Sequence, residues 1–476
     1  VLFGHHFSSI AGAGPIVGPI LAAALWGWAP ALIWVVIGSV FLGGVHDFGA
    51  LVISLKHRGS SIADITKDII SRRARIIFMV FVWLALVLVI AIFAKLGAQT
   101  LAEKPSIVIP SIGIIPLALL LGYAIYAKKM NQTVMTVVAL AVLTALILAG
   151  NALPLSLPNV TIWLVLLFIY SFIASITPVN ILLQPRDYLS SFLLIFGMIF
   201  GVLGIFIMHP TINSEAFIAV NPPRGGVLWP MLFVTVACGA ISGFHCLVSS
   251  GTTAKQIACQ SDACRIGYGG MLLEGGLAVI ALLSVSAGLT KGALNEFIFV
   301  SNNPIAAFTE GFGRITGKIL GPYGSIFSAT VLNAFILTTL DTATRIGRYL
   351  TEELFGVKNR YLSTLIVVIA AGVLTFSGSS GKIWPVFGAS NQLVAALALI
   401  VISCWLLGRG KRSWVVIIPA GFMLVTSIAA LVLQGISFIH DGKVILLLVI
   451  IALIICAVIL LYEAGLVFKN TCLITK

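Results

Sequence analysis

The stretch from Phe3 to Pro19, FGHHFSSIAGAGPIVGP, indicates the class of fold. It is largely apolar, yet two prolines and three glycines fall within the eight residues 12–19. These residues predict a broken helix, because Pro15 and Pro19 each lack an amide donor and clash with the preceding turn. Within a membrane, the freed carbonyl groups need protein, water or an ion as partners. Broken helices of this kind form the central site of many secondary transporters. The alternative is a kinked packing helix, in which Gly14 and Gly18 make a small-residue contact.

The composition of the whole chain agrees with a membrane setting. Of the 476 residues, 60% are hydrophobic and 9% are charged, and the mean hydropathy is +1.14. Soluble domains carry about 25% charged residues, so the composition excludes a soluble enzyme, a nucleic-acid binder and a disordered chain. The net charge of +13 is explained by Lys and Arg in the cytoplasmic loops of a multi-pass protein. We expect a lipid bilayer as the surroundings and no nucleic-acid partner.

Fourteen apolar runs predict an all-α polytopic membrane protein with about 14 transmembrane helices. If residue 1 is cytoplasmic and each run crosses once, most of the 28 Lys and Arg residues fall on the cytoplasmic side. That bias supports the orientation and places the C-terminus in the cytoplasm. The runs cover about 7–26, 29–54, 76–101, 107–127, 132–150, 160–183, 190–208, 226–248, 266–290, 319–340, 361–376, 383–407, 413–433 and 443–462.

A second break is predicted in the sixth run. Thr177, Pro178 and Asn180 lie near the end of the run 160–183, where the proline interrupts the helix beside a polar amide. The two breaks are five spans apart, which is the spacing of a five-plus-five inverted repeat. We therefore expect a core of two related halves, with extra helices added to it.

A cluster of hydroxyl groups follows the run 226–248. Hydroxyl oxygens are hard ligands that suit a small cation or a carboxylate, although they also cap helices by hydrogen-bonding to the backbone. Both interpretations remain open from the sequence. The cluster consists of Ser249, Ser250, Thr252 and Thr253.

Ionisable residues inside a membrane are candidates for function. Asp47 lies near the inner end of the second run, Glu274 lies among glycines in the ninth, and Asp341 closes the tenth. A buried carboxylate must be paired or protonated, so each is a candidate for a coupling proton. For Asp341 the alternative is a structural pair with Arg345, one turn further on. The histidines that fall toward the same side are candidates for binding substrate or a proton. These are His5, His6 and His245.

Other chemistry is not indicated. We expect no metal site at His5, His6, His46 and His245, because adjacent histidines on a helix point about 100° apart and the rest come from other spans. Nucleotide-binding motifs with a Gly-rich loop or a Walker lysine are missing from the sequence. No spacing supports a Ser249–His245–Asp47 triad. We therefore expect neither an enzyme nor a cofactor. Asn391 and Gln392 at the start of the twelfth run predict either a joint between helices or part of the pathway.

Several motifs, in order along the chain, resemble the carbon starvation protein CstA family. The resemblance extends from Val1 to about residue 410. The motifs are Val1–Phe7 (VLFGHHF), Gly12–Pro19 (GAGPIVGP), Leu183–Tyr188 (LQPRDY), Ile241–His245 (ISGFH), Ser249–Thr253 (SSGTT), Ile266–Gly269 (IGYG) with Glu274, Phe335–Asp341 (FILTTLD) with Thr344 and Arg345, and Trp384–Gly388 (WPVFG) with Ser390–Gln392 (SNQ).

The resemblance implies a transporter of the cell inner membrane that takes up peptides or, in some members, pyruvate, driven by protons. It implies a LeuT-like five-plus-five core in 1–410, with C-terminal transmembrane helices in 411–476. In such folds the first and sixth core helices line the substrate site, and the eighth often supplies hydroxyls to a cation. The implied substrate residues are Gly12, Gly14, Pro15, Thr177, Pro178 and Asn180, and the implied cation residues are Ser249, Ser250, Thr252 and Thr253.

The resemblance also implies that part of the chain is missing, because members usually carry a helix and a loop before the Phe-Gly-His-His motif. The function that we expect is import of a small carboxylate-bearing nutrient by alternating access, coupled to protons or to sodium. A passive channel and a membrane sensor without transport are the alternatives. A dipeptide site needs an acidic group for the amino terminus, whereas pyruvate needs donors only. Glu274 and Asp47 fit either that acid or the proton carrier, so the sequence leaves peptide and pyruvate open.

Overall fold

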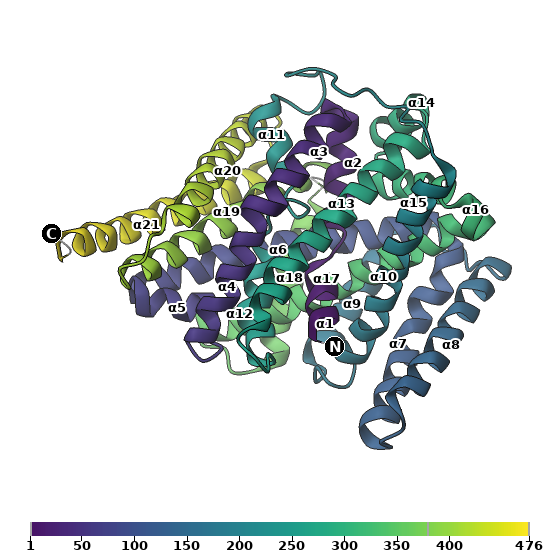
Figure 1. The fold of residues 1–476 in the computed structure, drawn as a ribbon, viewed down its shortest axis with the longest axis horizontal. Coiled ribbons are helices and arrows are strands. Elements are labelled where there is room, and N and C mark those ends of the chain that lie inside the picture. Colours follow the sequence, from purple (N-terminus) through teal and green to yellow (C-terminus); the bar gives the residue numbers. More distant parts are fainter. Residues whose placement is uncertain (1, 378–379, 475–476) are drawn as a thin grey trace.

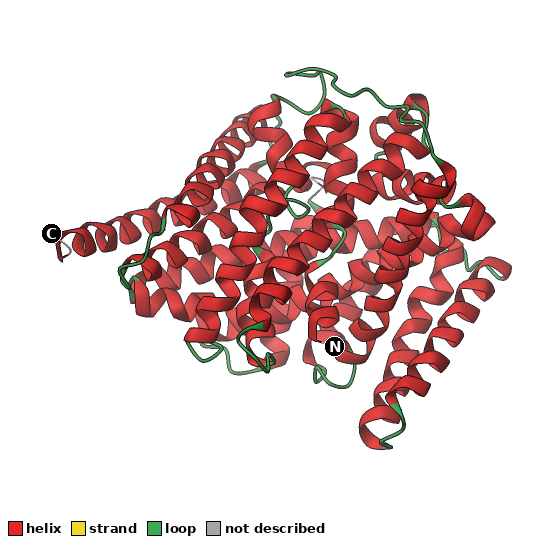
Figure 2. Cartoon of the chain, in the orientation of Figure 1, coloured by secondary structure: helices red, strands yellow, loops and turns green. Residues whose placement is uncertain are grey.

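The structure is a computed structural model that describes residues 2–377 and 380–474. The described part of the chain is built from helices joined by loops, and it contains no strand (Figure 2). Seven shorter π or 3-10 segments join or interrupt the α-helices. They are η1 (Gly38–Gly43), η2 (Pro105–Ile107), η3 (Tyr123–Ala127), η4 (Thr253–Lys255), η5 (Cys264–Tyr268), η6 (Glu296–Val300) and η7 (Gly321–Tyr323).

The α-helices follow the apolar runs, and many begin at a polar cap. Asn131, Asn159 and Asn359 each accept hydrogen bonds from the first free amides of a helix, which satisfies donors that have no partner within the helix. The helices are α1 (Leu2–Ile10), α2 (Gly14–Trp26), α3 (Trp28–Ile37), α4 (Gly44–Lys56), α5 (Ile62–Ile69), α6 (Arg72–Glu103), α7 (Val108–Gly122), α8 (Gln132–Ala152), α9 (Val160–Ile176), α10 (Leu183–Met208), α11 (Leu228–Thr235), α12 (Phe244–Gly251), α13 (Gly269–Gly288), α14 (Lys291–Asn295), α15 (Pro304–Ile315), α16 (Gly317–Leu320), α17 (Gly324–Phe355), α18 (Arg360–Phe376), α19 (Ser380–Leu407), α20 (Trp414–His440) and α21 (Val444–Ile474).

Among the described residues, ten helical segments are long and apolar enough to cross a membrane. The bent pair α1–α2 makes an eleventh, and α9 and α18 are shorter apolar helices. Each of the fourteen runs found in the sequence coincides with one of these segments or with the pair α11–α12. The all-helical, multi-span prediction is confirmed, whereas the count of fourteen crossings stays a prediction.

The first predicted break is present. Helices α1 and α2 meet at an angle of 43° across the residues 11–13. Pro15 occupies the first turn of α2, where its missing amide costs no helical hydrogen bond. The sequence GAGP therefore ends one half-helix and starts the next within a single span.

The second predicted break lies elsewhere. Helix α9 ends at Ile176 and α10 begins at Leu183, so Pro178 is in a turn between two spans and does not interrupt one. The span that is interrupted consists of α11 and α12, which are separated by the non-helical residues 236–243. This segment, VACGAISG, unwinds without a proline. Its two glycines, together with Val236, Cys238, Ile241 and Ser242, have lower helix propensity than alanine or leucine.

The two broken spans lie at the centre of the bundle. Helix α2 packs against α11, and α1 packs against α12, while α13, α6 and α17 surround them. Helices α7 and α8 form a hairpin at the lower right edge of Figure 1. Helices α20 and α21 pack against α19 on the opposite edge, where α21 runs outward to the C-terminus.

Candidate functional site

The two breaks touch at Gly14 and Cys238. A Cβ atom added to Gly14 would lie 2.4 Å from Cys238 Sγ, closer than any real contact of this kind. The backbone of the first broken span therefore approaches the unwound segment of the second only because residue 14 is a glycine. Gly12, two residues earlier, faces Thr339 of α17 in the same way, with its added Cβ 2.7 Å from Thr339 Oγ1.

Helix α19 braces the unwound segment through Asn391. Its Oδ1 accepts a hydrogen bond from the Phe244 amide (2.9 Å), and its Nδ2 donates to Ser242 Oγ (3.0 Å). The next residue, Gln392, donates from Nε2 to the carbonyl of Phe233 in α11 (2.6 Å). Backbone groups that the break frees thus find partners, as they must at membrane depth. Of the two roles that the sequence left open for this pair of amides, the structure favours the joint between helices.

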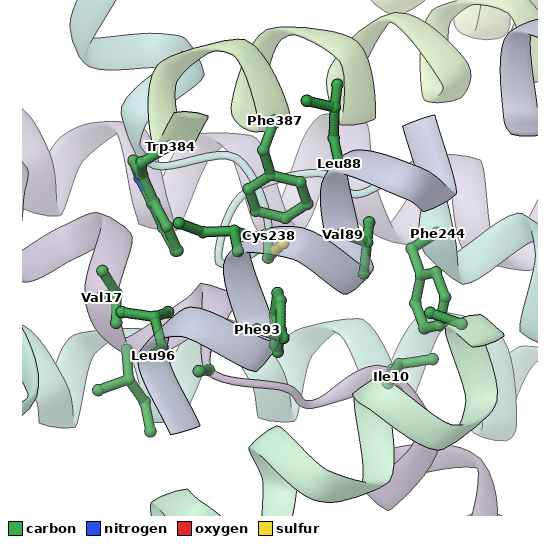
Figure 3. Close-up of a cluster of buried hydrophobic side chains, with 14 of the residues drawn as sticks. Ile10, Val17, Leu88, Val89, Phe93, Leu96, Cys238, Phe244, Trp384 and Phe387 are labelled. Carbon is green, nitrogen blue, oxygen red and sulfur yellow. The ribbon is translucent and has the colours of Figure 1, made fainter. Parts of the chain in front are cut away.

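Side chains fill the space between the breaks. Phe93 of α6 and Phe387 of α19 meet edge to face with ring centroids 5.9 Å apart, and Trp384 packs on Phe387 at 5.4 Å. Figure 3 shows Phe93 and Phe387 on either side of Cys238. A space of only about 10 Å³ is left beside Gly12 and Gly14. The central region is closed in this conformation.

A cavity of about 560 Å³ opens at the other end of the half-helices α1 and α12. Its rim carries the exposed residues Lys255 and Glu353, and its wall includes the buried residues Phe78 and Val248. Helices α5, α6 and α17 complete the lining. Several candidates from the sequence face this cavity. They are His5, Ser250, Thr252 and Arg345.

Asp47, His245 and Glu274 meet next to the cavity in a buried chain, although they come from α4, α12 and α13. His245 Nδ1 donates to Asp47 Oδ2 at 2.7 Å, and His46 Nδ1 donates to Asp47 Oδ1 at 2.7 Å. The second ring nitrogen of His245, Nε2, lies 3.0 Å from Glu274 Oε2, off the line of a straight hydrogen bond. All four side chains are fully buried. One imidazole thus separates two carboxylates.

His6 and Thr253 form a second contact between the half-helices. His6 Nδ1 lies 2.8 Å from Thr253 Oγ1. Its Nε2 is buried without a hydrogen-bond partner among the described residues, and it lies beside Gly270, one turn before Glu274 on α13. Ser249 Oγ is also buried with no partner in the described chain. These hydroxyls belong to α12 and η4, in the second broken span, and their role in a cation site stays a prediction.

Asp341 belongs to a separate cluster, which corrects the pairing that the sequence offered as an alternative. It forms an ion pair with Arg186 of α10 and accepts a hydrogen bond from the Tyr170 hydroxyl (2.7 Å). Arg345 instead donates to the carbonyls of Ala174 and Thr177, at 2.6 Å each. Arg186, from the motif LQPRDY, is fully buried although it is charged.

The remaining candidates are not at the breaks. Thr177, Pro178 and Asn180 lie on the turn between α9 and α10, where Pro178 and Asn180 are exposed. Arg186, Asp187 and Tyr170 were not predicted as site residues. The signal for the first two was the adjacent charged pair in LQPRDY, between apolar runs. In the described ranges, no group of three or more His, Cys, Asp or Glu side chains is arranged to hold a metal ion.

Comparison with known proteins identifies the family. The family model "Carbon starvation protein CstA" matches residues 1–309 and 288–430. The chain belongs to the carbon starvation protein CstA family. It is 32% identical over 510 residues to the peptide transporter CstA of Campylobacter jejuni, covering 90% of this chain and 72% of the relative. It is also 32% identical over 534 residues to the pyruvate/proton symporter BtsT of Escherichia coli, covering 91% and 74%.

Solved structures support the fold of this CstA-family chain. A manganese transporter from Eremococcus coleocola, in complex with an aromatic bis-isothiourea compound, has a TM-score of 0.60 at 14% identity, covering 98% of this chain and 94% of the other. MhsT in complex with L-phenylalanine has a TM-score of 0.53 at 13% identity, covering 96% and 98%. The fold is therefore LeuT-like, with a five-plus-five core and extra helices.

Proposed function

We propose that this chain is a secondary active importer that couples uptake of a small carboxylate-bearing nutrient, a peptide or pyruvate, to an inward flow of protons. The names of its relatives support this class of solute, since one is a peptide transporter and another a pyruvate/proton symporter. The proposal further takes Asp47, His245 and Glu274 as the proton site.

The observation that carries the proposal is the position of His245 between Asp47 and Glu274. With Asp47 ionised, the Nδ1 proton of His245 is committed to that carboxylate. One proton then lies either on Nε2 or on Glu274, and the site keeps a net charge of minus one. A second proton makes both His245 and Glu274 fully protonated and neutralises the site. Because buried net charge is costly, loading that proton changes how tightly α4, α12 and α13 are held together.

Helix α12 connects the proposed proton site to the cavity. It carries His245 on one face, while Ser250 and Gly251 line the cavity on another. The closed central region and the cavity at one end fit access from one side at a time, as alternating access requires. We propose that protonation at His245 changes the packing of α12 and α1, which open or close this cavity.

The basic residues of the loops support an orientation in which the cavity faces the cytoplasm and the C-terminus is cytoplasmic. In that arrangement the protein is a multi-pass protein of the cell inner membrane. Residues 1–410 form the transport core, and the helices in 411–476, which pack on α19, support it from one side.

The test is transport in proteoliposomes with wild type and Glu274→Gln. An inward proton gradient is imposed with and without sodium, and labelled pyruvate and labelled dialanine are followed. We expect accumulation to require the proton gradient and to be lost in Glu274→Gln, while exchange of substrate across the membrane is retained. The matched control is Glu296→Gln, because Glu296 is exposed and lies outside the site. Accumulation that needs sodium alone, or that survives in Glu274→Gln, contradicts the proposal.

A further inference from the structure

We propose that Asp187 binds the protonated amino group of the substrate at the wall of the cavity, so that the preferred solutes carry a free ammonium as well as a carboxylate. This inference rests on the proposed function and deepens it. Asp187 lines the cavity and lies on α10, in a cluster that is separate from Asp47, His245 and Glu274.

The cluster around Asp187 has an excess of negative charge. Arg186 is the one guanidinium between two carboxylates, because it contacts Asp341 through Nη1 and Asp187 through Nη2. Tyr170 donates its hydroxyl proton to Asp341 and is neutral. When both acids are ionised, these two carboxylates share the single charge of Arg186 in a buried position. Arg345 also interacts electrostatically with Asp341, whereas the ion pair of Asp187 is with the shared Arg186 alone. A buried carboxylate that is only partly compensated is costly, so Asp187 favours a monovalent cation in the cavity.

The second carboxylate oxygen of Asp187 is available to a solute in the cavity. Asp187 uses Oδ1 for Arg186 at 3.1 Å, which leaves Oδ2 available to a solute in the cavity that Asp187 lines. Its side chain is only 3% exposed, and that exposure is into the cavity that it lines. Asp341 Oδ1 is also buried without a partner within the described ranges. An ammonium on a solute in the cavity reaches Asp187 without entering the protein core.

The same cavity offers donors for a carboxylate. Arg345 lines it, and its Nη2 is bonded to the carbonyls of Ala174 and Thr177. The guanidinium has five N–H groups in all, and it also interacts with the Tyr349 hydroxyl at the cavity wall. Asp187 and Arg345 thus present both signs of charge to a solute. The volume of about 560 Å³ equals that of about 19 waters at roughly 30 Å³ each. This is ample for a short peptide.

The other occupants of such a site are a proton and a sodium ion. A proton on Asp187 would neutralise the carboxylate, yet it would not explain why Asp187 lies in the lining of a cavity. A small hard cation needs several oxygen ligands held around it at once, whereas the carboxylate of the Arg186 cluster that lines the cavity is Asp187 alone. The ammonium is therefore the occupant that fits both the charge and the opening.

The experiment compares three probes on purified protein in detergent and in proteoliposomes. These are dialanine, N-acetyl-dialanine, which lacks the ammonium, and pyruvate. Binding is measured as the shift in thermal unfolding temperature against ligand concentration, and uptake is measured by competition. In wild type we expect dialanine to bind at least tenfold more tightly than its N-acetyl derivative. In Asp187→Asn that preference should disappear, while the affinity for N-acetyl-dialanine stays within about twofold and pyruvate uptake is retained.

Two further variants keep the test decisive. Asp187→Glu retains the charge and should keep at least part of the preference for dialanine. Asp262→Asn is the matched control, because Asp262 is exposed and does not line the cavity, and it should leave the preference unchanged. Equal binding of dialanine and N-acetyl-dialanine to wild type overturns the inference. So does an equal loss of all three probes in Asp187→Asn, or a preference that follows sodium and not the amino group. Proton-driven uptake of pyruvate, which does not involve this contact, reports on the proposed function separately.

Discussion

His245 Nε2 lies 3.0 Å from Glu274 Oε2, and neither side chain is exposed. On its other nitrogen, the same imidazole contacts Asp47 at 2.7 Å. The ring therefore joins α4 to α13 through α12. Removing the imidazole leaves two buried carboxylates with no cation between them. A substitution of His245 is therefore a direct test of the proposed proton site.

Replacing His245 with Gln should abolish proton-driven accumulation, because an amide cannot exchange a proton between the two carboxylates. It should also lower the free energy of unfolding by about 3–5 kcal/mol, the usual cost of breaking a buried ion pair. Uptake in proteoliposomes and thermal unfolding in detergent measure the two effects. His440→Gln is the control, since His440 is exposed. Normal accumulation in a folded His245→Gln protein rules out this site as the proton carrier.

Access from the cavity side alone predicts a sharp contrast between two positions on α17. Thr342 lines the cavity, whereas Thr339, three residues earlier, lies in the closed region beside Gly12. After the exposed Cys259 and Cys264 are replaced by Ser, Thr342→Cys should react with a small water-soluble maleimide and Thr339→Cys should not. Mass spectrometry of the labelled protein measures both. Equal labelling of the two positions contradicts a closed centre. Dialanine should protect Thr342→Cys if it occupies the cavity.

The contact between the two breaks predicts that Gly14→Ala is destabilising. The added Cβ would meet Cys238 Sγ at 2.4 Å and Cβ at 2.6 Å, and overpacking of this kind costs about 1–3 kcal/mol. Cys238→Gly removes both atoms and should restore much of the loss in the double variant. Gly372→Ala on α18 is the control, because nothing lies within 4 Å of its added Cβ. It should leave stability unchanged or raise it by up to about 1 kcal/mol. Thermal unfolding in detergent compares wild type, Gly14→Ala, the double variant Gly14→Ala/Cys238→Gly, and Gly372→Ala.

The sequence was sufficient to locate the spans and the first break, because both depend on local features. An apolar run of membrane length predicts a helix wherever it occurs, and GAGP at 12–15 is a local signal for a break, because it combines two weak helix formers with a proline. The second break was misplaced because Pro178 is the stronger local signal. The residues 236–243 unwind in a tertiary setting, where Asn391 bonds the freed Phe244 amide from a distant part of the chain.

The candidate site, like the fold, could be predicted only in part from the sequence. Asp47, His245 and Glu274 were each conspicuous as ionisable groups in apolar runs, so residue type alone identified them. The contact between them could not be predicted, since Asp47 and His245 are 198 residues apart in the sequence. Arg186 was not predicted as a site residue, because its charge and the neighbouring Pro185 are typical of a loop. Its burial is explained by its partners, which include Asp341, 155 residues away.

The pair of Arg186 and Asp341 predicts a strongly non-additive mutant cycle. Arg186→Gln leaves Asp341 as a buried charge without compensation, so it should destabilise the protein by about 3–5 kcal/mol. Asp341→Asn in the same chain removes that charge, and the double variant should be more stable than Arg186→Gln alone. Thermal unfolding of the wild type, both single variants and the double variant completes the cycle.

A second mutant cycle, on Arg348 and Glu352, provides the matched comparison. Both residues lie on α17, the helix that carries Asp341. They form an i,i+4 pair with side chains that are 10% and 28% exposed, and pairs of this kind contribute about 0.3–0.5 kcal/mol. The coupling between Arg348→Gln and Glu352→Gln should therefore be several times smaller than that between Arg186→Gln and Asp341→Asn. If both cycles give the same small coupling, Arg186 is not neutralising Asp341. The charge argument that leaves Asp187 free to bind an ammonium then fails with it, because that argument requires the guanidinium to be engaged by both acids.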